Sequence, residues 1–142
     1  MTHSNRFDCE MRTTMPATLE AVDQFFVELG SRSHAMLEQH NSFPAELLLR
    51  EALTNAVVHG CGSDPGKQVR CFLRLRASRL LIAVADDGDG FDWHATRGNR
   101  ADVPDSSGRG MEILNIYASH VRFNKKGNVV TMITQLQGGK HA

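Results

Sequence analysis

The sequence has little of several features that would assign it to a specialised class of protein. Its 142 residues include three cysteines, four prolines, one tryptophan and one tyrosine. The cysteines, at positions 9, 61 and 71, are odd in number and have no CxxC spacing, which excludes a disulfide framework or a zinc knuckle. Basic and acidic residues balance at 16 each, so no charge excess points to nucleic acid or to a membrane surface as a partner.

Long hydrophobic runs are also missing. The longest, Leu80–Ala85, has the length of a strand and is far too short to span a membrane. Residues 1–8 contain no apolar stretch of the kind found in secretion signals. With 41% hydrophobic and 23% charged residues, the composition predicts one globular domain in the cytoplasm. We expect this domain to cover residues 7–136, with flexible tails at 1–6 and 137–142.

The pattern of apolar and polar residues predicts both strands and helices. Alternation and short apolar runs predict strands at 7–13, 68–76, 80–85, 120–123 and 129–135. Helical spacing predicts helices at 16–29, 44–59 and 110–119, with Pro16 opening the first and Gly30 and Gly60 ending the first two. Residues 33–40 fit a short helix or a continuation of the first, and residues 92–107 read as a polar loop.

A polar stripe on the helix predicted at 44–59 is the first stretch that could carry chemistry. Glu51, Asn55 and His59 follow at intervals of four, so they stack along one side of a helix, beside apolar residues that face the core. A carboxylate and an amide oxygen one turn apart suit a magnesium ion that keeps most of its waters. The carboxylate can also accept a proton from a nucleophile. The same pattern fits ordinary polar residues on a partly exposed helix.

The second stretch, Asp86-Asp87-Gly88-Asp89-Gly90, directly follows the most apolar strand. Glycines two apart allow the backbone to approach a flat ligand or to turn tightly. Asp86, at the strand end, is placed to accept a hydrogen bond from an exocyclic amine, which would discriminate adenine from guanine. The carboxylate pattern of a calcium loop is incomplete here. A turn rich in Asp and Gly is the alternative interpretation.

Two further glycine-containing stretches follow. Gly108-Arg109-Gly110 stands at the start of a predicted helix, where backbone N–H groups and the helix dipole favour an anion. Arg109 can add a charge-assisted contact to a phosphate, although the spacing excludes a Walker loop. Gly127 to Thr131 leads into the last strand and by itself indicates only a hairpin.

The order of these four stretches resembles the Bergerat nucleotide fold (the GHKL class) of gyrase, mismatch-repair and histidine-kinase ATPases. The resemblance spans about residues 7–135. It implies an α/β (α+β) two-layer sandwich, with helices on one face of a mostly antiparallel mixed sheet. Within this class the segments around Glu51–Gly60, Asp86–Phe91 and Gly108–Leu114 are most similar to anti-sigma-factor serine kinases.

This resemblance implies ATP and Mg²⁺ as cofactors and gives the motif residues their roles. Asn55 would ligate the magnesium ion, Glu51 would take the proton from a protein serine, and Asp86 would bind the adenine amine. The other implied nucleotide contacts are Gly88 and Gly90 at the pocket floor, Gly108, Arg109, Gly110 and Met111 at the phosphates, and Thr131 near the adenine. Arg109 would also stabilise charge on the γ-phosphate, while His59 is expected to be a structural residue at the helix end.

The implied substrate is a serine of a STAS-domain anti-anti-sigma protein, and the second partner is a sigma factor or another regulator. A homodimer is implied as well. Two other functions stay open: a nucleotide-gated switch that holds a partner without transferring phosphate, and an ATP hydrolase in which Glu51 activates water. Trp93 and His94 in the loop fit either a solvated segment or a partner surface.

Overall fold

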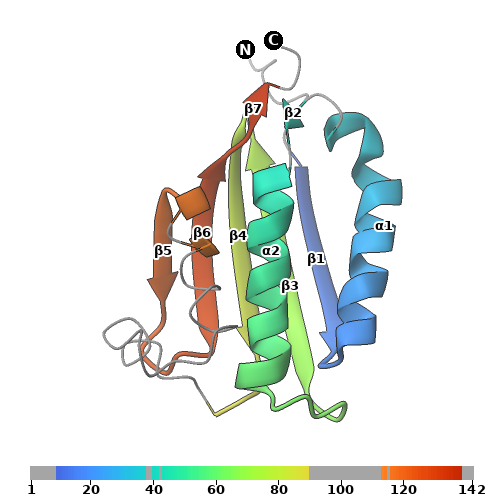
Figure 1. Cartoon of the computed structure of the whole chain (residues 1–142), viewed down its shortest axis with the longest axis vertical. Coiled ribbons are helices and arrows are strands. Elements are labelled where there is room, and N and C mark those ends of the chain that lie inside the picture. The colour runs from blue at the N-terminus through green and yellow to red at the C-terminus, as the bar shows by residue number, and fades with distance from the viewer. Residues whose placement is uncertain (1–8, 38–39, 42, 90–112, 115, 139–142) are drawn as a thin grey trace.

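The computed structural model describes residues 9–37, 40–41, 43–89, 113–114 and 116–138. Its elements follow the order β1, α1, β2, α2, η2, β3, β4, β5, β6 and β7 (Figure 1). The helices are α1 (Leu19–Leu37) and α2 (Phe43–Asn55), and α2 runs directly into a π-helical turn, η2 (Ala56–Gly60).

The main sheet has five strands in the order β1-β3-β4-β6-β5. Their bounds are Cys9–Pro16 for β1, Gln68–Arg76 for β3, Arg79–Asp86 for β4, His120–Phe123 for β5 and Val129–Gln135 for β6. Every pairing between described strands is antiparallel, so the mixed sheet that we expected is wrong for this part of the chain. The apolar strand β4 lies at the centre, as its composition predicts.

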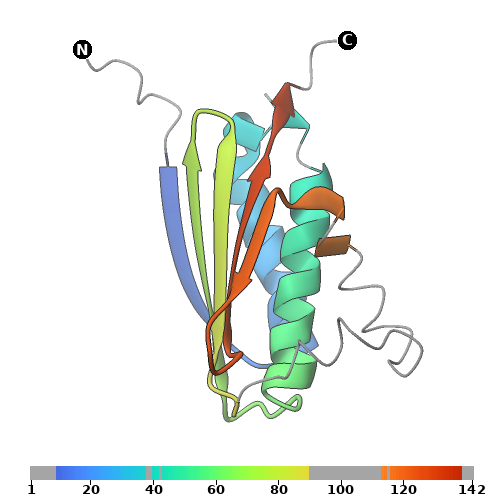
Figure 2. The same ribbon diagram turned by 90° about the vertical axis from the view of Figure 1, so that its left-hand side faces the viewer.

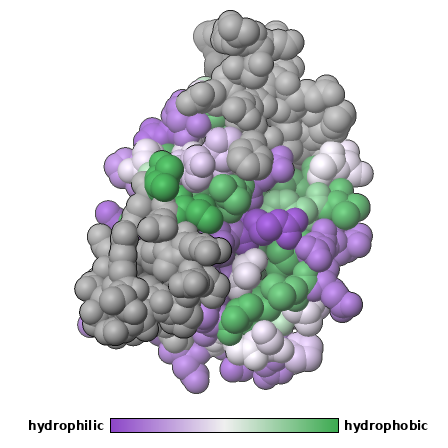
Figure 3. Space-filling model, viewed as in Figure 1, coloured by the Kyte–Doolittle hydropathy of each residue, from purple (hydrophilic) through white to green (hydrophobic). Residues whose placement is uncertain are grey.

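Both helices cover the same face of the sheet, which gives the expected two-layer architecture (Figure 2). The core lies between the layers, where Leu48, Leu53 and Val57 of the helical layer meet Ile82 and Met132 of the sheet, all fully buried. On the helix side, hydrophobic residues also reach the surface between hydrophilic ones (Figure 3). Leu19 and Val27 of α1 are among them.

The first helix begins later than the sequence predicts, and it continues beyond Gly30, which was one of the two expectations for residues 33–40. Pro16 is the last residue of edge strand β1, a position where its missing N–H is tolerated. Thr18 caps the helix instead, since its Oγ1 accepts a hydrogen bond from the N–H of Ala21 at 3.0 Å. Gly30 does not stop the helix, which continues to Leu37. A glycine in a helix interior costs about 1 kcal/mol, which packing of the rest of the helix can offset.

The end of the described chain also differs from expectation. Gln137–Gly138 form a short strand, β7, which pairs antiparallel with β2 (His40–Asn41). We expected residues 137–142 to be a flexible tail, and this pairing corrects that expectation for the first two. Leu136, just before β7, is buried against Ala45 and Leu75.

Candidate functional site

A small hollow lies where α2 and η2 cross the end of β4 and the start of β6. It is lined by Ala52, Asn55, Ala56, Gly60, Val84, Asp86, Leu114, Phe123, Gly127, Asn128, Val129 and Val130. The lining is mostly apolar, and the polar groups come from Asn55, Asp86 and Asn128. The hollow encloses about 40 Å³, room for only a few water molecules, so entry of a ring-sized ligand requires its walls to separate.

Asp86, the last residue of β4, is the buried carboxylate of this hollow, with 6% of its surface exposed. Its Oδ1 accepts a hydrogen bond from the N–H of Gly88 at 2.8 Å. Burial raises the pKa of Asp86, the neighbouring charge of Asp87 adds to the rise, and the Gly88 hydrogen bond opposes it. A buried acceptor of this kind suits a ligand that brings its own N–H donors, because an unpaired carboxylate is costly away from water.

The pKa of Asp87 shifts in the opposite direction to that of Asp86. Its carboxylate bonds Arg70 at 2.9 Å and accepts the N–H of Gln68 at 3.1 Å, both on β3. These two hydrogen bonds, with that of Arg70 the stronger influence, lower the pKa of Asp87. Asp87 therefore ties the end of β4 to β3, and its carboxylate is already engaged outside the hollow.

Two glycines bring the backbone of η2 against the end of β4. A Cβ atom on Gly88 would lie 1.7 Å from the carbonyl oxygen of Gly60, and a Cβ on Gly60 would lie 2.5 Å from Oδ2 of Asp86. No side chain fits at either position without displacing the backbone or the carboxylate. The sequence pattern singled out Gly88, but it treated Gly60 only as a helix stop.

The polar stripe of α2 is present only in part. Asn55, the last residue of α2, lines the hollow, and Glu51 lies one turn earlier on the same helix, half-buried and outside the lining. Burial raises the pKa of Glu51. A carboxylate with a raised pKa is a stronger base, as proton abstraction requires.

His59 does not extend this stripe, so that part of the prediction is wrong. The N–H of Cys61 bonds the carbonyl of Ala56, five residues back, at 2.9 Å. The wider π-helical turn rotates the following residues away from the α-helical positions. His59 is exposed and does not line the hollow, whereas Gly60 does.

Thr131 lies on the other face of the sheet, which contradicts its expected place beside Asp86. Along β6, Val130 and Met132 face the core, so Thr131 between them faces away from it, opposite Ala83 of β4. Val130 lines the hollow instead.

Asn128 is the residue that sequence reasoning missed. Its Nδ2 donates to the carbonyl of Asp86 at 3.1 Å, and its own carbonyl accepts the N–H of Asp86 at 2.9 Å. Asn124 holds the turn in place, since its Oδ1 accepts the N–H groups of Gly127, Asn128 and Val129. An asparagine after a glycine in a turn was the available signal, but that pattern indicates only a hairpin.

The remaining predicted site residues, Gly90, Gly108, Arg109, Gly110 and Met111, lie outside the described residues, as do Trp93 and His94. Within the described ranges no cluster of three or more histidine, cysteine, aspartate or glutamate side chains could hold a metal ion. No helix in these ranges is long and apolar enough to cross a membrane. None of the three cysteines, all of them among the described residues, forms a disulfide, and Cys61 and Cys71 are buried whereas Cys9 is exposed.

A match to a family model assigns most of the chain to a known domain family. Residues 13–134 match the family described as the histidine kinase-like ATPase domain. The serine-protein kinase RsbW of Bacillus subtilis (strain 168) is 26% identical over 103 residues, which cover 67% of this chain and 64% of that protein. A solved histidine kinase domain, from a blue-light-activated histidine kinase of Erythrobacter litoralis, has a TM-score of 0.48 and 21% identity. That match covers 66% of this chain and 43% of the other chain.

Proposed function

Because the chain belongs to the histidine kinase-like ATPase domain family, we propose that it is an ATP-dependent protein serine kinase. The observation that carries this proposal is the buried carboxylate of Asp86 at the edge of a mostly apolar hollow, with Asn55 lining the hollow and Glu51 one helical turn away. The similarity to a protein named as a serine-protein kinase supports the reaction class.

The adenine ring fits the chemistry of the hollow. Val84, Val130 and Phe123 supply apolar walls for a flat ring. Oδ1 of Asp86 already accepts one N–H group, and its remaining acceptor capacity is available for the exocyclic amine of adenine. Guanine carries a carbonyl at the corresponding position, where it would face a carboxylate that cannot donate. Gly88 and Gly60 supply the close backbone approach that a flat ligand requires.

The proposed Mg²⁺ ion would have Asn55 as its protein ligand, and waters and phosphate oxygens would complete its coordination. Mg²⁺ commonly keeps several waters and takes one or two protein ligands together with phosphate oxygens, whose charge it offsets. The Asn55 side-chain oxygen, at the end of α2 beside the hollow, would be the protein ligand. Arg109 and the N–H groups of Gly108, Gly110 and Met111 would contact the phosphates, as the sequence analysis predicts.

Glu51 would act as the base in phosphoryl transfer. The serine oxygen of the substrate bonds to the γ-phosphorus while the bond from that phosphorus to the bridging oxygen breaks, and ADP leaves. The serine proton passes to the carboxylate of Glu51, whose raised pKa favours acceptance. Transfer should therefore become faster as pH rises through the pKa of Glu51.

The proposed substrate is a serine on a STAS-domain protein, and the proposed client is a sigma factor or a comparable regulator, bound by a homodimer in the cytoplasm. These proposals follow from the sequence resemblance, and the serine specificity matches the name of the relative above. The second candidate function is a nucleotide-gated switch without transfer, which is favoured by the position of Glu51 outside the lining of the hollow.

The deciding experiment incubates the chain with γ-labelled ATP, Mg²⁺ and each STAS-domain protein of the source organism. We expect one STAS protein to be labelled on serine, and Glu51→Gln to abolish the label while ATP still binds. The matched control is Glu46→Gln, which removes an exposed carboxylate near the start of the same helix and should transfer normally.

Two outcomes would contradict the kinase proposal, and a third would contradict only the role of Glu51. ATP binding without any labelled protein favours the nucleotide-gated switch. Release of free phosphate without a labelled protein favours the hydrolase. Transfer that survives Glu51→Gln removes Glu51 from the role of base.

A further inference from the structure

The face of the sheet opposite the helices is covered by no described element (Figure 2). The pleat places alternate residues of each strand there, and we call this surface the arginine face. Its basic members are Arg12 of β1, Arg70, Arg74 and Arg76 of β3, Arg79 of β4 and Arg122 of β5. Two acidic side chains lie on this side of the described sheet: Glu10 of β1, and Asp87, which directly follows β4 and forms an ion pair with Arg70.

The centre of the arginine face is apolar. Phe72 of β3 lies opposite Ala83 of β4, and Leu81 of β4 lies opposite Ile133 of β6. A shallow hollow of about 280 Å³ opens between β1, β3 and β4, where Arg12, Arg70, Phe72, Ala83 and Ala85 contribute to its lining. The surface thus has an apolar centre with guanidinium groups around it.

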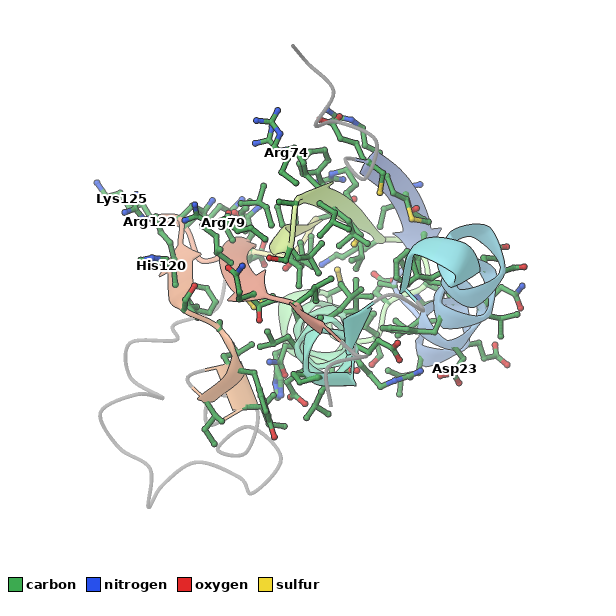
Figure 4. The ribbon with its side chains drawn as sticks, turned by 90° about the horizontal axis from the view of Figure 1, so that it is seen from above. Asp23, Arg74, Arg79, His120, Arg122 and Lys125 are labelled. Carbon is green, nitrogen blue, oxygen red and sulfur yellow. The ribbon has the colours of Figure 1, made fainter. Side chains whose placement is uncertain are left out.

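Most of the guanidinium groups on this face form no ion pair with the carboxylates of the described residues. Arg70 pairs with Asp87, and Arg74 approaches Glu10 at 4.0 Å. Arg12, Arg76, Arg79 and Arg122 form no ion pair with a carboxylate among the residues that the structure describes. Figure 4 shows Arg74, Arg79 and Arg122 on the side of the sheet away from the helices, whereas Asp23 lies on the helix side.

One arrangement on this face is unfavourable for the isolated chain. Arg76 and Arg79 lie directly opposite each other across β3 and β4, flanking the turn at Ala77 and Ser78. Like charges at directly opposite positions of an antiparallel pair destabilise the sheet. A carboxylate from outside would relieve this repulsion and could bind both guanidinium groups.

We propose that the arginine face is a docking surface for a protein partner that presents carboxylates around an apolar ridge. An apolar centre with arginine around it is the anatomy of a protein interface.

Single-stranded nucleic acid would need free aromatic rings for stacking. Phe72 is the only phenylalanine, tyrosine or tryptophan on the described part of this face, and the guanidinium of Arg12 lies over its ring at 4.6 Å. A second copy of the chain would bring arginines against arginines. This surface is separate from the hollow at Asp86, so the proposal does not depend on the kinase activity.

The test measures binding of a fluorescein-labelled amphipathic peptide built from leucine and glutamate, by anisotropy, to the full chain. The comparison probes are the same peptide with lysine in place of glutamate, and oligo(dT). The informative variant is Arg79→Glu, which replaces a repulsive pair with an attractive one and should raise the melting temperature slightly. A loss of binding in this variant therefore cannot come from unfolding. The matched control, Arg50→Glu, makes the same charge change on α2 and loses the ion pair with Asp23.

We expect the acidic peptide to bind the native chain, and we expect its affinity to fall as the salt concentration increases. Arg79→Glu should weaken binding about tenfold, and Arg50→Glu should leave it unchanged. A benzoylphenylalanine at Ala83 should cross-link the peptide, and one at Val27 should not. The proposal is overturned if the acidic peptide does not bind, if Arg79→Glu binds as well as the native chain, or if oligo(dT) binds more tightly than the peptide. If the chain dimerises as its concentration rises, and Arg79→Glu changes that dimerisation, the partner on the arginine face is a second copy of the chain and the proposal is overturned.

Discussion

At the residue scale, Asp86 and Asp87 are sequence neighbours whose carboxyl groups have opposite pKa shifts. Burial raises the pKa of Asp86, and the hydrogen bond from Arg70 is the main cause of the lowered pKa of Asp87. Alternation along the strand is the reason, because it directs one side chain into the molecule and the next one toward β3. The two groups therefore make stability depend on pH in opposite directions.

The sign of the Asp86 effect can be tested with Asp86→Asn. Because the folded pKa of Asp86 is above its unfolded value, its contribution to stability falls as pH rises through that interval. Asp87 has a lowered folded pKa, so its contribution is lost as pH falls through that pKa. Asp86→Asn should be at least as stable as the native chain at neutral pH. Between acidic and neutral pH the variant should lose less stability than the native chain loses. Chemical denaturation across this pH range measures the stability at neutral pH and its change with pH. The control is Asp89→Asn, which changes an exposed aspartate.

Gly88 is the residue at which the fold tolerates least change. A Cβ there would overlap the carbonyl oxygen of Gly60, so Gly88→Ala must push η2 away from β4. We expect a loss of at least about 2 to 3 kcal/mol in the free energy of unfolding, together with loss of nucleotide binding.

The control for Gly88→Ala is Gly30→Ala. A Cβ at Gly30 meets no heavy atom within 4 Å, and this position lies inside α1. That variant should gain roughly 0.5 to 1 kcal/mol. Equal stability of the two variants would show that the contact between Gly60 and Gly88 is not as close as described.

At the scale of the elements, the sequence predicted the five strands of the main sheet and the extent of the second helix well, and the ends of the first helix poorly. Apolar alternation fixes β3, β4 and β6, because each buries one face. Helix ends depend on single contacts, such as the Thr18 cap and the close approach of Gly60 to Gly88, which have no periodic signal. Thr131 was misplaced for a related reason: only the register between β4 and β6 decides which face a residue occupies.

The hairpin between β5 and β6 offers a test of how an element supports the site. Asn128→Ala removes the hydrogen bond to the carbonyl of Asp86 and the one from Asn124 at 2.8 Å. We expect a loss of about 1 kcal/mol per hydrogen bond in stability and a clear loss of affinity for ATP, measured by calorimetry. The control, Gln135→Ala, removes a side-chain hydrogen bond to Ser78 at the other end of β6 and should not change affinity. Equal affinity in both variants would remove Asn128 from the site.

At the scale of the whole molecule, charge balance conceals a separation of charge. The chain carries 16 basic and 16 acidic residues, yet the strand register gathers six arginines on one face of the sheet. Composition could not predict this, because the arginines are spread over residues 12–122 in the sequence. The two proposed surfaces thus lie on opposite faces of one sheet, one facing the helices and one facing away.

The integrity of the whole fold can be followed through its thiols. Burial raises the pKa of Cys71 to about 12 and also raises the pKa of Cys61, so both should be unreactive in the folded state, whereas Cys9 is exposed. A thiol reagent should modify Cys9 rapidly and the other two only when the core opens. ATP with Mg²⁺ should slow the second phase, since a ligand that binds only the folded state stabilises it. Rapid labelling of all three thiols in the native chain, and of the two remaining thiols in Cys9→Ser, would contradict the buried core.

The central claim is that the hollow at Asp86 binds an adenine nucleotide. The most direct measurement is calorimetric titration of the native chain and Asp86→Asn with ATP and with GTP, in the presence of Mg²⁺. We expect the native chain to bind ATP at least about tenfold more tightly than GTP, because a hydrogen bond to a charged group contributes about 1.5 to 3 kcal/mol. Asp86→Asn should stay folded and lose that preference. Equal binding of ATP and GTP by the native chain, or unchanged ATP affinity in Asp86→Asn, would contradict the account.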